Sequence, residues 1–447
     1  MILREKEIII PEVGDGRSLI EYFSKVCKKE LASNETLNRF VVSITEDGNY
    51  FCELGILVND DSYPVSQRES IFNFGRREVE NTAQFNTVLL IPTGIGAQIG
   101  GHCGDGNAVA RLIASACDNL ITHPNVVNAS DINEMTENTL YVEGSIITRL
   151  MMGQIGLQKV RSNRILMLMD KHEDQLFNNE IVNAVSTARI SLGINCDVYE
   201  MDNIIKSVSS YAEKSGRAVG TVEHLDRLFE IINKYKSEYD AIGLSTFIEV
   251  PKEYHLNYFI TNEDMINPWG GIESMLTHSI AEEFQIPCAH SPMMASREIM
   301  EMEVGIVDPR KAPETSSTTY LHCILKGLHK SPKIVPYDKG LNAEDISCLI
   351  IPDGCIGLPT LVAIEHGIPV IAVKENKNSM RNNLENLPFK KGQLFIVENY
   401  LEAVGVMHLL KSGVSKESVR RPILYTTVLE DNKEQVNNKL NVSQRGL

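Results

Sequence analysis

From Asn86 onward, short apolar segments alternate with longer segments of helical periodicity, and this alternation constrains the fold more than any other feature. The apolar segments 86–92, 164–170, 346–353 and 368–373 are rich in Val, Ile, Leu and Met and have the length of buried strands. Strands that alternate with helices usually pair in parallel, with helices packed against the sheet. We therefore expect an α/β fold built from two Rossmann-like parallel-sheet lobes.

The domain boundaries follow from where this alternation starts and stops. The first part of the chain predicts a strand, a helix and a hairpin whose turn contains Gly48-Asn49. We expect residues 1–84 to form a small N-terminal α+β extension, 85–160 plus 335–410 the first lobe, 161–334 the second lobe, and 420–447 a polar tail that frays.

Two segments share an order of elements. Residues 89–125 and 349–376 each run through a strand, a proline, a Gly-rich turn, a helix, a second strand and an asparagine. An internal duplication would place the Gly-rich turns of two related lobes at one cleft. Reuse of a common β-turn-α order is the alternative interpretation.

The charge and cysteine content exclude several classes of protein. A net charge of −16 opposes binding to the nucleic acid polyanion. No apolar run approaches the roughly 20 residues that span a bilayer, and the N-terminus lacks the apolar core of a secretory signal. An odd number of cysteines without a CxxC pair is typical of reduced thiols. We expect a cytoplasmic protein with no nucleic acid or membrane partner, and leave a homo-oligomer open; the cysteines are residues 27, 52, 103, 117, 196, 288, 323, 348 and 355.

Six glycines fall within residues 91–107, which raises the question of what needs so much bare backbone. The turn follows a strand and precedes a helix, and ligands of open α/β sheets bind at this edge. Amides near a helix N-terminus favour an anion. We expect Thr93, Gly94, Gly96 and Gly101 to contact an anionic ligand. A dinucleotide, for which the glycine spacing is unusual, and a purely structural turn are the alternatives.

The same turn carries candidate catalytic groups. Cys103, and Cys355 in the second copy, are candidate bases or nucleophiles, because a helix N-terminus lowers the pKa of a thiol. Two facing thiols would suit removal of a proton from one face of a carbon and its return on the other. We expect His290 to be the acid–base partner and Asp105 to orient these groups. Buried structural cysteines and a helix-capping Asp105 are the alternatives.

Further polar residues follow the ends of expected strands or begin expected helices, where binding groups gather. Surface loops and an ordinary surface cation are the alternatives. The expected ligand contacts are Asn125, Asn128, Asp131, Asn267, Trp269, Gly270, Arg310 (as a carboxylate clamp) and Asn376.

A metal site is not expected. His255, Glu273, His278 and His290 could in principle supply ligands, but they show no recognised metal-binding spacing. We predict no cofactor, with a nucleotide as the alternative.

The motifs PTGIGAQIGG, THPNVVNASDINEM, NPWGGIESMLTH and GIPVIAVKEN stand between about Phe72 and Leu410. They resemble an uncharacterised bacterial family known as a domain of unknown function, which implies no catalytic residue. The order of elements is also similar, more weakly, to the aspartate/glutamate racemase superfamily. That similarity implies two Rossmann-like lobes and a cofactor-free pair of cysteines, but Ser245 and Thr246 stand where those enzymes have Cys-Thr.

We therefore expect an enzyme that acts on a small anionic metabolite in a cleft between the lobes. The expected chemistry is cofactor-independent proton transfer of the isomerase, racemase or lyase type. A transferase or oxidoreductase that binds a nucleotide or nucleotide-sugar is one alternative, because 352–373 predicts a β-turn-α-β unit whose helix could meet a diphosphate. A non-enzymatic small-molecule sensor is the other.

Overall fold

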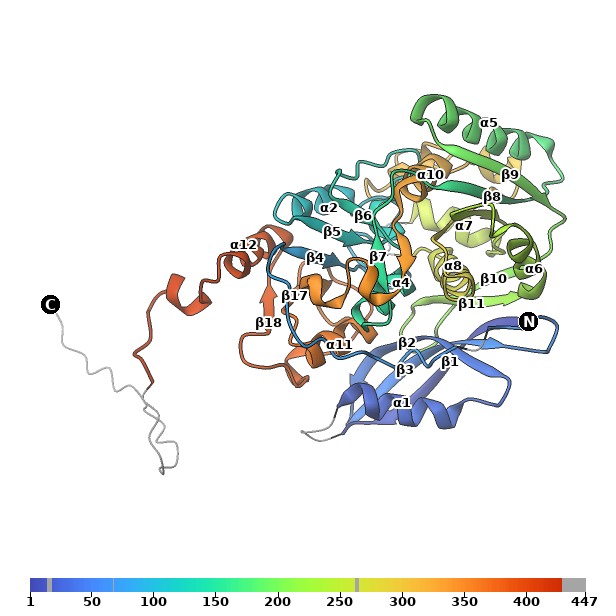
Figure 1. Cartoon of the computed structure of the whole chain (residues 1–447). Coiled ribbons are helices and arrows are strands. Elements are labelled where there is room, and N and C mark those ends of the chain that lie inside the picture. Colours follow the sequence, from blue (N-terminus) through green and yellow to red (C-terminus); the bar gives the residue numbers. More distant parts are fainter. Residues whose placement is uncertain (14–17, 67, 262–264, 428–447) are drawn as a thin grey trace. The chain divides into compact units, whose positions relative to one another are not determined.

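Two parallel sheets form the centre of the protein, as the alternation of strands and helices predicts (Figure 1). The computed structural model describes residues 1–13, 18–66, 68–261 and 265–427. The larger sheet has the strand order β18-β17-β15-β4-β5-β6, and every neighbouring pair is parallel. Its strands are β4 (Asn86–Leu89), β5 (Asn119–Thr122), β6 (Thr139–Tyr141), β15 (Ile346–Pro352), β17 (Val370–Val373) and β18 (Leu394–Val397).

This strand order is that of doubly wound dinucleotide-binding folds. In chain order the six strands stand 6-5-4-1-2-3, so the direction of winding reverses between β4 and β15. The two central strands, β4 and β15, are buried along their whole length, as parallel strands between helices require. The helices that follow them are α2 (Asn107–Ala114), α3 (Pro124–Val127), α4 (Gly144–Met151), α11 (Leu358–His366) and α12 (Tyr400–Lys411).

The second parallel sheet has the order β13-β12-β8-β9 and lies between the two halves of the first sheet in the sequence. Residues Ala241 to Thr246 of β12 are all buried, because helices cover both of its faces. Its strands are β8 (Arg164–Asp170), β9 (Asn195–Met201), β12 (Ala241–Thr246) and β13 (Cys288–Pro292). Its helices are α5 (Gln175–Leu192), α6 (Leu225–Tyr235), α7 (Lys252–Ile260), α8 (Gly270–Phe284), α9 (Arg297–Met300) and α10 (Leu321–Lys330).

The N-terminal residues form the expected helix and hairpin, but their sheet extends beyond residue 84. The order of this antiparallel sheet is β10-β11-β1-β3-β2-β16, so it takes strands from three distant parts of the chain. No strand is expected at 206–223 from the sequence. In the structure β11 pairs with β1, and β10, with its Ser and Val residues, pairs with β11. The elements are β1 (Ile2–Pro11), α1 (Leu19–Glu30), β2 (Glu35–Glu46), β3 (Asn49–Val58), β10 (Lys206–Tyr211), β11 (Ala218–Glu223) and β16 (Ile356–Gly357).

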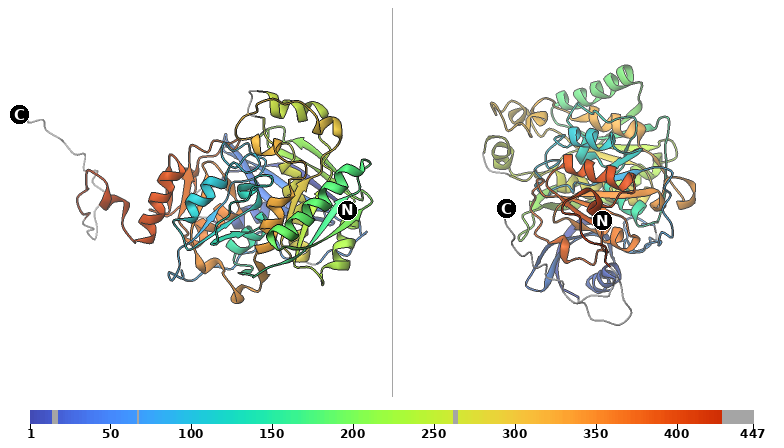
Figure 2. Two further views of the ribbon diagram at one scale, coloured as in Figure 1. Left: turned by 90° about the horizontal axis from the view of Figure 1, so that it is seen from above. Right: turned by 90° about the vertical axis from the view of Figure 1, so that its left-hand side faces the viewer.

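Residues Met1–Met407 form one compact unit, in which the N-terminal elements and α5 lie at opposite ends (Figures 1 and 2). A short two-stranded sheet of β7 (Gly156–Gln158) and β14 (Lys333–Val335) joins the stretches before and after the second parallel sheet. Residues His408–Leu447 are a separate unit. Within it, residues 411–427 are exposed, and 428–447, most of the predicted polar tail, lie outside the described residues.

The two Gly-rich turns lie at one edge of one sheet. The first follows β4 and the second follows β15, and these two strands are parallel neighbours. The turns of a duplicated segment were expected to face each other from separate lobes. The structure instead places them side by side, on either side of the point where the winding reverses.

Candidate functional site

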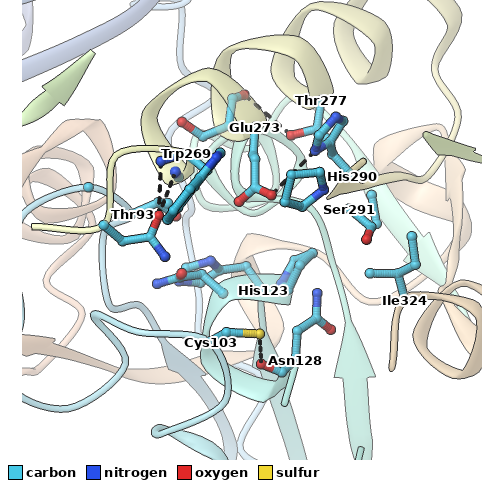
Figure 3. A pocket seen from close by; sticks show the side chains of 18 of the residues that line it. Thr93, Cys103, His123, Asn128, Trp269, Glu273, Thr277, His290, Ser291 and Ile324 are labelled. Carbon is cyan, nitrogen blue, oxygen red and sulfur yellow. Dashed lines mark hydrogen bonds and ion pairs between the residues drawn. The ribbon is translucent and has the colours of Figure 1, made fainter. Parts of the chain in front are cut away.

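A pocket of about 880 Å³ lies where the carboxyl edges of both parallel sheets meet the antiparallel sheet (Figure 3). Thr93 after β4, Ile351 of β15 and Pro292 of β13 all line it, as does Arg39 of β2. A volume of this size suits a small metabolite or a cofactor. The reversal of winding in the larger sheet therefore coincides with a pocket that its loops line.

The pocket gathers most of the residues singled out from the sequence. Gly96, Asp105, Arg310 and Asn376 are not among the residues that line it. Those that do are Thr93, Gly94, Gly101, Cys103, Asn125, Asn128, Asp131, Asn267, Trp269, Gly270, His290 and Cys355.

The Gly-rich turn is needed for close backbone packing. A Cβ on Gly101 would stand 2.0 Å from the Ala97 oxygen, and one on Gly104 would stand 2.1 Å from the Ala129 Cβ. Gly94 and Gly96 also adopt positive φ, which favours glycine. These contacts answer the question raised by the sequence: the bare backbone is packed against the protein itself.

Several amides of this turn are already bound by the protein's own side chains. Asp105 Oδ1 accepts hydrogen bonds from the Gly100 and His102 amides, at 2.8 and 3.3 Å. Glu314 Oε1 accepts one from the Cys103 amide at 2.9 Å, and Asn376 Oδ1 accepts one from Ile99. These four amides therefore bind the protein's own side chains, whereas the amides of this turn were expected to hold a ligand anion.

Asp105 braces the turn and does not cap the helix. Helix α2 has Gly106 as its N-cap and no side-chain capping bond. Burial raises the pKa of Asp105 to about 7, although both bonded amides oppose this. Its Oδ2 is buried without a hydrogen-bond partner.

The remaining predicted residues outside the pocket hold the same turn in place. Asn376 also donates to the Ile99 oxygen, and a Cβ on Gly96 would clash with Ile266 at 2.7 Å. Arg310 binds Asp308 and donates to Gln98 Oε1 at 2.8 Å. Arg310 was expected to bind a carboxylate of the ligand. It instead binds the carboxylate of Asp308 in the same chain.

Both candidate thiols line the pocket in their protonated form. The Cys103 thiol donates to the Asn128 oxygen at 3.2 Å, and burial raises its pKa well above the usual range, with Cys323 and Glu314 adding to the effect. Burial raises the pKa of Cys355 as well. A thiolate base therefore lacks the electrostatic support that the sequence interpretation assumed.

His290 forms part of a hydrogen-bonded chain that ends in the pocket at Glu273. Glu273 Oε1 lies 3.3 Å from His290 Nδ1, and His290 Nε2 lies 2.9 Å from Thr246 Oγ1. The His290 side chain is fully buried, whereas that of Glu273 is 27% exposed. Figure 3 shows the Glu273 carboxylate directed into the pocket with the imidazole beside it. With Glu273 ionised, Nδ1–H donates to the carboxylate and Nε2 accepts from Thr246.

Two more carboxylate–histidine pairs line the same pocket. Glu143 Oε1 lies 3.0 Å from His278 Nε2, and Asp131 Oδ1 lies 3.2 Å from His322 Nδ1. The hydrogen bond to Asp131 raises the pKa of His322. His123, also in the wall, accepts from the Ile91 amide, and burial lowers its pKa to about 4. The pocket is therefore supplied with acid–base groups on several sides.

A buried cluster lies below Cys103. The Tyr258 hydroxyl donates to Glu314 at 2.8 Å and lies 2.7 Å from His102 Nδ1. The Lys311 ammonium lies over the Tyr258 ring, 4.7 Å from its centroid. Burial raises the pKa of Glu314 to about 7.

Helix N-termini offset part of the negative charge of the wall. Residues from the first turns of α4, α8, α10 and α11 line the pocket, and a helix N-terminus carries a partial positive charge. Glu143 accepts from two amides at the start of α4, and Glu273 lies in the first turn of α8. The wall nevertheless holds more carboxylates (Asp131, Glu143, Glu180, Glu273, Glu282 and Glu314) than guanidinium groups (Arg39, Arg149 and Arg217).

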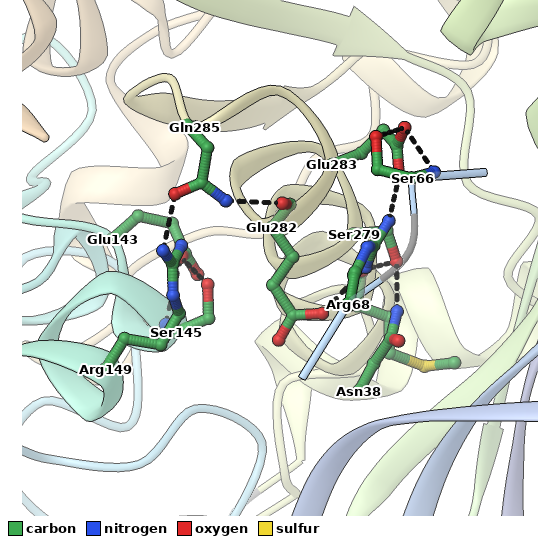
Figure 4. Close-up of polar contacts among 11 residues, drawn as sticks. Asn38, Ser66, Arg68, Glu143, Ser145, Arg149, Ser279, Glu282, Glu283 and Gln285 are labelled. Atoms are coloured by element: carbon green, nitrogen blue, oxygen red, sulfur yellow. Dashed lines mark hydrogen bonds and ion pairs between the residues drawn. The ribbon is translucent and has the colours of Figure 1, made fainter. Parts of the chain in front are cut away.

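Charged contacts also fix α8 on the side of its C-terminal turns (Figure 4). Arg68 binds Glu282 at 3.0 Å and also binds Glu283, while Ser66 donates to Glu283. Burial raises the pKa of Glu282 to about 7. These contacts tie the helix that carries Glu273 to the segment after β3.

A family model described as "protein of unknown function" (DUF3326) matches residues 86–420. The chain belongs to this family. The DUF3326 region therefore contains both parallel sheets and most of the pocket, and the N-terminal strands that bring Arg39 lie before it. The resemblance inferred from the sequence motifs is confirmed.

A relative of this DUF3326 protein is an "uncharacterized lipoprotein" of Synechococcus sp.. The two are 31% identical over 336 residues, which cover 73% of this chain and 91% of the relative. No solved structure matches the chain. The similarity to the racemase superfamily stays a prediction.

Sequence reasoning missed several wall residues of this DUF3326 protein. Arg39 lies within an expected strand, and Arg217 lies in a segment with no expected element. His123 stands in the motif THPNVVNASDINEM but was not singled out, and Glu143 and Glu314 were not singled out either. The position of Glu143 between a strand and a helix was the one available signal, since capping residues occupy that place. Across the described residues, no group of three or more His, Cys, Asp and Glu side chains is arranged to hold a metal ion, and no helix has the length and hydropathy to cross a membrane.

Proposed function

We propose that this protein is an enzyme that transfers protons on a small anionic metabolite bound in the pocket, as isomerases, racemases and lyases do. The observation that carries the proposal is the chain Glu273–His290–Thr246, in which the carboxylate faces the pocket and the imidazole is buried behind it. The acid and base are side chains, so the proposed chemistry needs no cofactor.

Glu273 is the proposed general base. A base must have a lone pair directed at the substrate, and Glu273 is the exposed end of its chain. His290 is a positioning residue: its Nδ1–H fixes one carboxylate oxygen, and Thr246 fixes the ring. This assignment replaces Cys103 and Cys355 as the proposed base, because burial keeps both thiols protonated.

Two further pairs in the pocket wall offer groups that could return a proton. Asp131–His322 involves α10, and Glu143–His278 joins the N-cap of α4 to a later residue of α8. An isomerase or racemase removes a proton from the substrate with one group and returns a proton with another. A lyase instead donates a proton to the leaving group.

The test is exchange of substrate hydrogen with solvent. The protein is incubated in D2O with hydroxy, amino and dicarboxylic acids and sugar phosphates, and C–H loss is followed by NMR. We expect the wild type to label one class, and Glu273→Gln to exchange about 10²–10⁴ times more slowly. Glu253→Gln is the matched control, because Glu253 is also in the first turn of its helix but is exposed.

Two results would reject this proposal. Ligands that raise the Tm without any exchange would indicate a binding protein, which is the sensor alternative. Equal exchange rates in the wild type and Glu273→Gln would remove Glu273 as the base.

A nucleotide ligand remains the second candidate function. The strand order of the larger sheet favours it, because dinucleotides bind at this reversal of winding. Against it, the Gly100 and His102 amides are bound by Asp105. A rise in Tm with NAD, ATP or UDP, and none with the acids above, would favour the nucleotide.

The proposed location is the cytoplasm, since the nine cysteines are all free. The description of the Synechococcus relative as a lipoprotein offers a lipid-anchored location as the alternative.

A further inference from the structure

Two arginines contribute to the pocket wall from the antiparallel sheet. Arg39 belongs to β2, and Arg217 immediately precedes β11. Their side chains are only 12% and 2% exposed. Two buried guanidinium groups at a pocket wall are costly to maintain unless negative groups face them.

Carboxylates face these arginines from behind the wall. Glu5 Oε1 binds Arg39 and lies 3.6 Å from Arg217 Nη2, and Glu53 binds Arg217 Nε. Neither glutamate lines the pocket, whereas both arginines do. The carboxylates thus hold the guanidinium groups from one side and leave the pocket side to the arginines.

The sheet is built to allow this arrangement. Gly55 of β3 stands between Glu5 of β1 and Arg39 of β2 in the register. A Cβ on Gly55 would lie 3.0 Å from the Arg39 Cβ. The glycine therefore leaves room for the arginine to reach across β3 to the carboxylate.

The carboxylates do not satisfy every donor of the two arginines. Arg39 Nε is buried without a hydrogen-bond partner, and Arg217 Nη2 meets Glu5 Oε1 only at 3.6 Å, beyond hydrogen-bond distance. Burial and then the charge of Arg217 lower the pKa of Arg39 to about 10, so the two positive charges lie close together. Both nitrogens are enclosed by protein, so a ligand in the pocket contacts the part of Arg39 that remains exposed, 12% of its side chain. Guanidinium groups bind carboxylate and phosphate oxygens strongly.

We propose that Arg39 and Arg217 form the subsite that binds the carboxylate or phosphate group of the substrate. This inference deepens the proposed function, on which it rests. Arg39 Nη1 lies 3.5 Å from Ser274 Oγ, and Ser274 is the neighbour of Glu273 in α8. The anionic group is therefore held one residue along the helix from the proposed base, within a wall that is otherwise rich in carboxylates.

The test measures binding of two simple anions, malonate and inorganic phosphate, to the full chain by calorimetry and thermal shift. Arg39→Gln should weaken binding at least tenfold. Glu5→Gln should tighten it about tenfold, because it removes the opposing charge and keeps an acceptor oxygen of the same size. Arg111→Gln, a change of an exposed arginine in α2, is the matched control and should bind like the wild type.

The opposite signs make the result decisive even if Arg39→Gln fails to fold, which far-UV circular dichroism would show. Unchanged or weaker binding by folded Glu5→Gln would overturn the proposal, as would an absence of binding by both anions. Malonate binding alone assigns a carboxylate substrate, and phosphate binding alone a phosphorylated one. Anion binding with these signs but no hydrogen exchange would keep the subsite and reject the proton-transfer function.

Discussion

Cys103 keeps its proton because burial removes the water that would solvate a thiolate, and Glu314 nearby adds negative charge. The same burial raises the pKa of Glu314 and Asp105 to about 7. The sequence gives no sign of this, since a thiol near a helix N-terminus is usually activated. The difference arises from side chains that are distant in sequence.

The thiol can be tested without a substrate. We expect alkylation of Cys103 by iodoacetamide to be slow at pH 7–8 and to rise steadily up to pH 9, because only the thiolate reacts. Peptide mass spectrometry after timed quenching gives the rate. A rate that levels off near pH 7 would show an activated thiol and restore the cysteine mechanism.

At the level of elements, glycines set the distance between α8 and the sheet strands. A Cβ on Gly271 would lie 2.3 Å from the Ala218 oxygen, next to Arg217. A shift of α8 would therefore move Glu273 and the arginine subsite together.

We expect Gly271→Ala to lower the free energy of unfolding by about 1–3 kcal/mol, because the added methyl overpacks this contact. Gly405→Ala is the control. Gly405 lies inside α12 with nothing within 4 Å of its Cβ position, so alanine should stabilise by about 0.5–1 kcal/mol. Urea unfolding followed by circular dichroism measures both. Equal stability of the two variants would contradict the packing account.

Elements with strong local patterns could be predicted from the sequence. The parallel strands, the hairpin of β2 and β3 and the main helices follow from apolar periodicity and turn residues. The pairing of β1 with β11 could not, because it joins residues more than 200 positions apart and β11 has no distinctive pattern. The arginine subsite was missed for the same reason.

At the scale of the site, the sequence predicted many of the residues that line the pocket but not the contacts among their acid–base groups. Residues such as Thr93 and Trp269 were found because loops at strand ends gather there. Glu273 was considered only as a metal ligand, since its contact with His290 depends on how α8 lies over β13. Spacing along one helix carries no information on such contacts.

At the scale of the whole molecule, four buried carboxyl groups have pKa values raised to about 7: Asp105, Asp170, Glu282 and Glu314. The ordinary pKa values of these carboxyl groups are 3.8 for Asp and 4.5 for Glu. Between these values and pH 7 the folded state binds more protons than the unfolded state. Each group therefore stabilises the fold at low pH and loses this contribution as pH rises through about 7.

We expect the Tm to fall between about pH 5 and pH 7, with each carboxyl contributing up to about 1.4 kcal/mol per pH unit. His123 and His366, with pKa values lowered to about 4, act in the opposite direction below pH 6.5. Calorimetry across this range measures the slope. Asp105→Asn should flatten it, since the amide oxygen still accepts from Gly100 and His102, and a slope unchanged by this variant would contradict the account.

The larger sheet is assembled from two stretches of chain that lie on either side of the second sheet. β4 pairs with β15, about 260 residues later, so neither half has a complete set of neighbours until the intervening segment has been made. During synthesis, the edge of β4 remains without its partner while residues 90–345 emerge, and contacts so distant in sequence form slowly. The nascent chain thus exposes an apolar strand edge for most of its translation. Its yield in the cell should therefore depend on factors that shield this edge from other chains.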